Sequence, residues 1–104
     1  MTTVAEIVDS MKARFNPDAA AGLDIIFQFD IDDGDTYHIV VKDNTCHIEA
    51  GAHEDPSVTL IMDSKTMVAI MTGEQNGMQA FMMGKIRAEG NMMLATKLND
   101  LFPL

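Results

Sequence analysis

Hydrophobic and polar residues alternate through the middle of the chain as they do in half-buried strands. Every second residue is apolar from Leu23 to Ile31, and the alternation returns from Tyr37 to Val41, from Cys46 to Ala50 and from Val58 to Met62. A period of two places one set of side chains on a buried face. We therefore expect four strands, with a shorter fifth over residues 85–89.

The turn residues set the predicted register of the first three strands. Asp43-Asn44 is typical of a two-residue hairpin, which places Val41 opposite Cys46. Setting Ile31 opposite Tyr37 requires an odd number of connecting residues. We therefore expect a three-residue turn there, with Gly34 in the left-handed conformation.

Helical spacing appears on both sides of the predicted strands. Thr3 and Glu6 have the capping-box spacing at the start of an amphipathic helix that runs to Phe15. A second helix is expected from Asp63-Ser64 to Gly73, a third over residues 78–83 and a last one from an Asn91 cap to Phe102. The pattern predicts one α+β domain over residues 1–104, with a mainly antiparallel sheet and its helices on one face.

The two C-terminal helices are apolar around more of their circumference than one sheet face can cover. A bound apolar ligand, a partner chain or a neighbouring helix must cover the rest. Ten methionines accompany this excess, and eight of them fall between residues 62 and 93. Methionine adapts to irregular volumes, so the cluster fits either an adaptable pocket or ordinary core packing. The residues that widen the last helix are Met92, Met93 and Ala95.

Charge and cysteine content narrow the range of functions. The chain has a net charge of −9, from 16 acidic and 7 basic residues. This balance excludes nucleic-acid binding and leaves at most transient membrane contact. One cysteine, no apolar run long enough to span a bilayer and no signal-peptide pattern favour a cytoplasmic protein.

The only cluster that resembles a catalytic or metal site is His38, His47 and Glu49. In the predicted register His38 faces Glu49, with His47 on the diagonal, but on an open, solvated face without a pocket. A cross-strand polar pair is the better interpretation. His53 lies in a loop, and Cys46 belongs to the inward set, where a lone thiol is usually inert. We expect no enzyme activity, no metal and no cofactor.

The outer face of the sheet is otherwise polar, with three apolar exceptions. These are scattered surface residues or a weak homodimer contact. They are Ile26, Val40 and Ile61.

Three segments, over residues 55–60, 78–86 and 89–102, carry a resemblance to a known family. Together they resemble the sterol carrier protein type-two family, also called the sterol-binding or non-specific lipid-transfer domain. Asp55-Pro56-Ser57-Val58-Thr59-Leu60 is similar to the start of the family's fourth strand. Met78 to Ile86, with Gly84-Lys85 after the helix, is similar to its helix and the strand that follows. Glu89-Gly90-Asn91, with Leu94-Ala95 and Leu98 to Phe102, is similar to its last turn and helix.

The resemblance implies a five-stranded sheet with one crossover, covered by helices that enclose an apolar tunnel. The tunnel would bind a sterol, fatty acid, fatty acyl-CoA or phospholipid without catalysis. The alternative is a structural or dimerising accessory module of a lipid-metabolising enzyme system. The chain ends Phe102-Pro103-Leu104 rather than in a peroxisomal address, which favours a stand-alone bacterial or cytosolic member. The expected lining residues are Phe15, Met62, Met67, Met71, Phe81, Met82, Met93, Leu94 and Leu98.

Overall fold

The computed structural model describes residues 3–102, without the side chains of Met92 and Asn99. The expected place of Met92 on the apolar surface therefore lies outside the described part. No helix within residues 3–102 is both long and apolar enough to cross a bilayer. The elements in chain order are α1 (Val4–Arg14), β1 (Ile25–Ile31), β2 (Thr36–Lys42), β3 (Thr45–Ala50), β4 (Val58–Met62), α2 (Ser64–Met71), α3 (Gly77–Met82), β5 (Arg87–Gly90), α4 (Met92–Ala95) and α5 (Leu98–Leu101).

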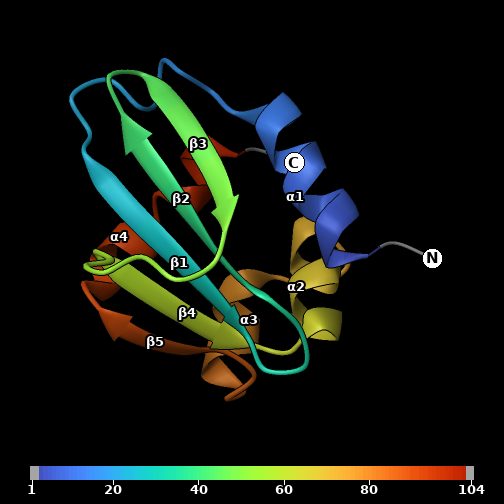
Figure 1. The fold of residues 1–104 in the computed structure, drawn as a ribbon. Coiled ribbons are helices and arrows are strands. Elements are labelled where there is room, and N and C mark those ends of the chain that lie inside the picture. The colour runs from blue at the N-terminus through green and yellow to red at the C-terminus, as the bar shows by residue number, and fades with distance from the viewer. Residues whose placement is uncertain (1–2, 103–104) are drawn as a thin grey trace.

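Five strands form a single sheet in the order β3-β2-β1-β4-β5 (Figure 1). The central strand β1 pairs antiparallel with β2 and parallel with β4, and the two outer pairs are antiparallel. Because β3 and β4 lie on opposite sides of β1 and β2, the segment 51–57 must cross the sheet to connect them. The predicted mainly antiparallel sheet with one crossover is confirmed.

The core lies between one face of the sheet and the helices. Burial alternates along β1 and β4, as the period of two predicts. The inward side chains of Phe27, Phe29 and Val58 are at most 2% exposed. Met11 from α1 and Met67 from α2 belong to the same buried cluster, so the helices cover this face, as expected.

Polar contacts fix both ends of α1. The Thr3 hydroxyl accepts a hydrogen bond from the Glu6 amide at 3.2 Å and donates one to the Glu6 carboxylate at 3.4 Å. The predicted N-cap is therefore present. At the other end Arg14 Nη1 donates to the carbonyl oxygen of Met71 at 2.9 Å, at the end of α2. A cation at this position satisfies a helix carbonyl and ties the two helices together.

The register at the first hairpin differs from the prediction. Tyr37 lies opposite Phe29 rather than Ile31. Gly34 does not adopt the positive φ that we expected there. Five residues, 31–35, separate the last cross-strand pair, Asp30 and Thr36, so the parity and the buried face of β2 are the predicted ones.

Residues around this turn contact elements on the other side of β1. Ile31 pairs with Met62 of the parallel strand β4. The Asp33 carboxylate accepts hydrogen bonds from the backbone amide and the hydroxyl of Ser64, at 2.7 and 2.8 Å. The turn therefore holds the start of α2.

The second hairpin matches the prediction. Val41 lies opposite Cys46, and the two connecting residues, Asp43 and Asn44, have φ values of 53° and 60°. Two successive left-handed residues define the turn that suits the twist of paired strands.

The expected last helix is divided into α4 and α5. The Thr96 hydroxyl donates to the carbonyl of Met93 at 2.7 Å, and the Lys97 amide donates to Leu94. The Lys97 amide thus bonds to a carbonyl three residues earlier instead of four, and this interrupts the regular α-helical pattern. The break lets α5 turn toward the core, where Leu101 is fully buried.

Candidate functional site

The helix α3 leaves most of its side chains uncovered. The Asn76 side-chain oxygen caps it by accepting hydrogen bonds from the amides of Met78 and Gln79. Ala80 is the one buried residue of α3. A helix of six residues is not stable on its own and depends on tertiary packing. The exposed fractions of its large apolar side chains, with that of the following residue, are Met78 60%, Phe81 37%, Met82 79% and Met83 65%.

The structure brings six of the nine expected lining residues to the core. Met62 and Met67 are fully inside it, at 4% and 1% exposure. Four others are half-buried and pack against the same cluster. These six side chains come from the end of α1, from β4 and from the helices that cover the sheet. The half-buried four are Phe15, Met71, Leu94 and Leu98.

The other three expected lining residues lie at the surface. Phe81 is 37% exposed, and Met82 and Met93 are 79% exposed. Asn91 positions Met93 by accepting a hydrogen bond from its amide at the start of α4. A role for all nine residues in lipid binding stays a prediction.

A pocket of about 380 Å³ lies where α2 begins and α3 ends. Two carboxylates and two ammonium groups line it, from Asp32, Asp63, Lys65 and Lys85. The Lys85 amide donates to the carbonyl of Ala80 at 2.9 Å, which fixes Lys85 to the end of α3. The remaining lining residues are Thr66, Ala69, Gln75 and Gly84.

Sequence reasoning missed Lys65 and Lys85. Each has a local signal, because Lys85 follows the glycine that ends α3 and Lys65 lies in the first turn of α2. Their convergence on one pocket depends on how α2 and α3 sit at the end of the sheet. No local pattern shows that arrangement.

Two aspartates are held as carboxylates at the start of α2. Hydrogen bonds from the backbone amide and the hydroxyl of Ser64 lower the pKa of Asp33. Hydrogen bonds from the side chain and the amide of Thr66 lower the pKa of Asp63. Both groups therefore stay ionised in the helix cap and are committed to structure.

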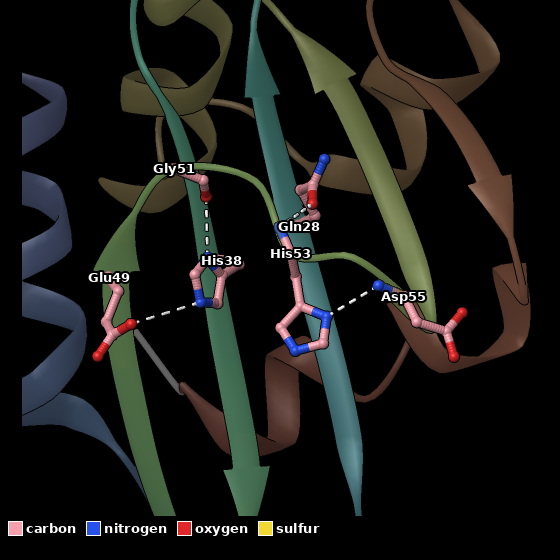
Figure 2. Close-up of polar contacts among 6 residues, drawn as sticks. All are labelled: Gln28, His38, Glu49, Gly51, His53 and Asp55. Atoms are coloured by element: carbon pink, nitrogen blue, oxygen red, sulfur yellow. Dashed lines mark hydrogen bonds and ion pairs between the residues drawn. The ribbon is translucent and has the colours of Figure 1, made fainter.

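The predicted His38–Glu49 pair is present, but His38 is not on an open face. Its Nε2 lies 3.7 Å from a Glu49 carboxylate oxygen, while its Nδ1 is 2.8 Å from the carbonyl of Gly51. The residue is 9% exposed. Figure 2 shows the reason, since the crossover segment passes over the outer face of the sheet and brings His53 beside His38.

Hydrogen bonds hold this crossover in place. The His53 amide donates to Gln28 Oε1 on β1 at 2.9 Å, and His53 Nδ1 accepts from the Asp55 amide at 3.0 Å (Figure 2). The two imidazole rings meet edge to face, with centroids 5.4 Å apart. These contacts give His53, which sequence reasoning left without a role, a structural one.

The described residues offer little for catalysis. Burial raises the pKa of the Cys46 thiol, against a smaller opposite effect of Lys12, so the thiolate nucleophile is disfavoured. No group of three or more His, Cys, Asp or Glu side chains among residues 3–102 could hold a metal ion. The apolar surface of α3 and the adjacent pocket are the stronger candidates for a functional site.

Comparison with known families gives a match over nearly the whole chain. The model of the SCP-2 sterol transfer family covers residues 8–103. The chain belongs to the SCP-2 sterol transfer family. Membership implies lipid binding or transfer, and it confirms the resemblance read from the sequence.

The relatives of this SCP-2 domain include much longer proteins. Sterol carrier protein 2 from Bos taurus is 33% identical over 81 residues, which is 73% of this chain and 15% of the relative. Hydroxysteroid dehydrogenase-like protein 2 from the same organism is 30% identical over 101 residues, which is 94% of this chain and 24% of the relative. The chain therefore spans a quarter or less of the length of these relatives.

Solved structures share the SCP-2 fold. The crystal structure of Sterol Carrier Protein 2 Like 2 from Aedes aegypti is 26% identical, with a TM-score of 0.77 and 94% of each chain covered. The solution structure of palmitated SCP2L2 from the same mosquito has a TM-score of 0.82 at 24% identity, with 99% of this chain and 96% of that chain covered. A sec-alkylsulfatase from Pseudomonas sp. contains the same fold, with a TM-score of 0.84 at 16% identity, over 93% of this chain and 16% of the enzyme.

Proposed function

We propose that this chain is a non-catalytic lipid carrier that encloses an acyl chain between the inner face of the sheet and the helices α2 to α5. The observation that carries the proposal is membership of the SCP-2 family over residues 8–103. The Met-rich packing under α2 and the exposed apolar side chains of α3 support it. Both provide apolar surface that a lipid can cover.

Apolar burial supplies the binding energy in this proposal. Each methylene group removed from water contributes about 0.8 kcal/mol. The helices α3, α4 and α5 are short, and short helices open locally at low cost. A shift of these helices would bring Phe81, Met82 and Met93 from the surface onto the ligand, beside the half-buried Leu94 and Leu98.

The first experiment is mass spectrometry of the purified protein under native conditions, followed by organic extraction of any bound molecule. A stoichiometric lipid supports the carrier function and identifies the ligand class. An empty protein that also fails to bind a fluorescent fatty acid would contradict the carrier function.

Two substitutions test the lining. Met82→Lys introduces a charge at a side chain that is 79% exposed, so the fold should tolerate it. Leu98→Asp places a carboxylate at a half-buried position. Each should weaken fatty-acid binding at least roughly tenfold, because a charge buried against an acyl chain is costly. Thr45→Lys, at the exposed second hairpin, is the control, and thermal unfolding verifies that each variant is folded. Unchanged affinity in folded Met82→Lys and Leu98→Asp would argue against this lining.

A second candidate is an accessory module that uses the same apolar surface to pack on an enzyme or on another copy. The observation that favours it is that similar segments occur in relatives named as enzymes, such as peroxisomal multifunctional enzyme A of Dictyostelium discoideum, 42% identical over 62 residues, which is 59% of this chain and 14% of that relative. It predicts a concentration-dependent mass and no bound lipid. In either role we place the protein in the reducing cytoplasm, where the single Cys46 would stay a free thiol.

A further inference from the structure

The helix α3 and the residue after it, Met83, carry most of the large apolar side chains that are exposed in the described part of the chain. Among the described residues, the large apolar side chains that are exposed are Met78, Phe81, Met82, Met83 and Met93, and four of the five belong to this one segment. An exposed apolar patch of this kind marks an interaction site. The charged residues beside this patch indicate which kind of partner it binds.

Those charges are of both signs. Lys65 and Lys85 line the pocket of about 380 Å³ next to the end of α3, and so do Asp32 and Asp63. Neither lysine forms an ion pair within the part of the chain that the structure describes. Asp63 is taken up by its hydrogen bond from the Thr66 amide, so Lys65, Lys85 and Asp32 are the charged groups left for a ligand that itself carries one phosphate and one ammonium.

The distribution of charge over the chain excludes strong attraction to an anionic surface. Residues 1–63 contain 13 acidic and 3 basic side chains, and residues 64–104 contain 3 acidic and 4 basic ones. The α3 segment thus belongs to the nearly neutral part of the chain. The strongly acidic part would still repel a negatively charged membrane.

We propose that α3 docks on the surface of a bilayer of zwitterionic phospholipid, with its methionines among the acyl chains and one phospholipid head group in the adjacent pocket. Lys65 and Lys85 would contact the head-group phosphate, and Asp32 its ammonium. Because Lys85 is fixed to α3 by its bond to Ala80, inserting the helix places the pocket at the level of the head groups. The proposal goes beyond the carrier function. It rests on that function in one respect only, which is that the carried lipid is exchanged at the bilayer surface.

A second copy of the chain fits the patch less well. Two copies with a net charge of −9 each repel one another. A six-residue helix is also a small contact beside the roughly 800 Å² that each partner contributes to a standard interface. A bilayer needs no matching partner surface, and insertion of a few apolar side chains is sufficient for reversible binding.

The test is flotation of the protein with vesicles of phosphatidylcholine and phosphatidylethanolamine. The double variant Met78→Gln/Met83→Gln should lower vesicle partitioning roughly tenfold, because two exposed apolar side chains no longer enter the acyl layer. Neither residue belongs to the expected lipid lining. The double variant Lys65→Ala/Lys85→Ala should lower partitioning several-fold, whereas Lys42→Ala should not change it. Lys42 is the last residue of β2. The hairpin between β2 and β3 lies at the opposite end of the sheet from α3 (Figure 1).

Lipid composition and ligand binding complete the test. Replacing half of the phospholipid with anionic phosphatidylglycerol should weaken binding, and stronger binding would overturn the head-group assignment. Absence of flotation, or a concentration-dependent mass without flotation, would overturn the docking proposal. Binding of a fluorescent fatty acid without vesicles should be equal in all variants. If the unsubstituted protein floats with the vesicles but does not bind the fluorescent fatty acid, this result would contradict the carrier function and leave the docking proposal standing.

Discussion

At the scale of single residues, Gly90 connects the edge strand β5 to the sheet at a point without space for a side chain. It has a φ of +89°, and a Cβ atom added there would lie 2.7 Å from the backbone carbonyl oxygen of Ser57. The same oxygen accepts a hydrogen bond from the Asn91 amide. Glycine is therefore required here both by conformation and by the closeness of another backbone.

Gly90→Ala should lower the free energy of unfolding by about 3 kcal/mol, because the backbone contact must open in addition to the conformational strain. Gly22→Ala is the matched control, since Gly22 has a φ of +75° and no atom lies within 4 Å of the place that its added methyl group would take. It should cost only about 1 kcal/mol. Urea unfolding measures both changes. Equal losses in the two variants would show that the closeness to Ser57 contributes nothing.

At the scale of elements, the start of α2 shows how a turn and a helix stabilise each other. Asp63 is the N-cap residue of the helix, and Asp33 reaches the same helix end from the turn between β1 and β2. Carboxylates at a helix N-terminus also interact favourably with the helix dipole. The cap therefore joins the central parallel strands to the helix that follows them.

The cap makes stability depend on acidity. The pKa of Asp33 and that of Asp63 are both lowered from the ordinary value of 3.8 by hydrogen bonds in the folded protein. A carboxylate whose pKa is lower in the folded than in the unfolded protein stabilises the fold at pH values above the unfolded pKa. This contribution is lost as the pH falls from 3.8 through the lower pKa of the folded protein. Asp33→Asn/Asp63→Asn should therefore lose less stability on acidification than the unsubstituted protein.

Urea unfolding over a range of acidic pH measures this difference. The control is Asp9→Asn/Asp24→Asn, at exposed carboxylates that accept no hydrogen bond from the residues described. It should keep the acid dependence of the unsubstituted protein. Parallel curves for all three proteins would show that the cap does not couple folding to protons.

At the scale of the whole molecule, the sheet and the C-terminal helices should differ in local stability. The central strand β1 is paired on both sides, and its buried residues alternate with half-buried ones. The helix α3 buries only Ala80. Amide protons in α3 should therefore exchange with solvent much faster than those of β1, because α3 can open without disturbing the core. Hydrogen-exchange mass spectrometry measures this, and equal protection would mean that α3 opens only on global unfolding.

The sequence predicted the parts of the fold that repeat locally. The alternation from Ile25 to Ile31 and the Asp43-Asn44 turn are sufficient to define strands, the buried face and one register. Contacts between distant segments were not predictable in this way. Asp33 in the first hairpin bonds Ser64, which is 31 residues later in the chain. The crossover covers His38 on a sheet face that the pattern predicted to be open.

The same limit applies to the candidate site. Apolar composition predicted that Met82 and Met93 need a cover, and the structure leaves both exposed at 79%. Composition reports how much apolar surface exists but does not tell which part the core takes up. The pairing of Lys65 with Lys85 in one pocket depends on the packing of α2 near α3, which leaves no local signal.

The exposure of the α3 methionines also makes this surface sensitive to oxidants. Peroxide converts an accessible methionine into its polar sulfoxide, and reductases reverse the change. Met78, Met82 and Met83 are 60–79% exposed, whereas Met11 and Met67 are 1% exposed and protected by the core. Mild oxidation would therefore turn the apolar helix face polar while the fold stays intact. Oxidative stress would act on this protein as a reversible switch of surface chemistry, readable as sulfoxide at Met78, Met82 and Met83 of the α3 segment and at the equally exposed Met93, but not at Met11 or Met67.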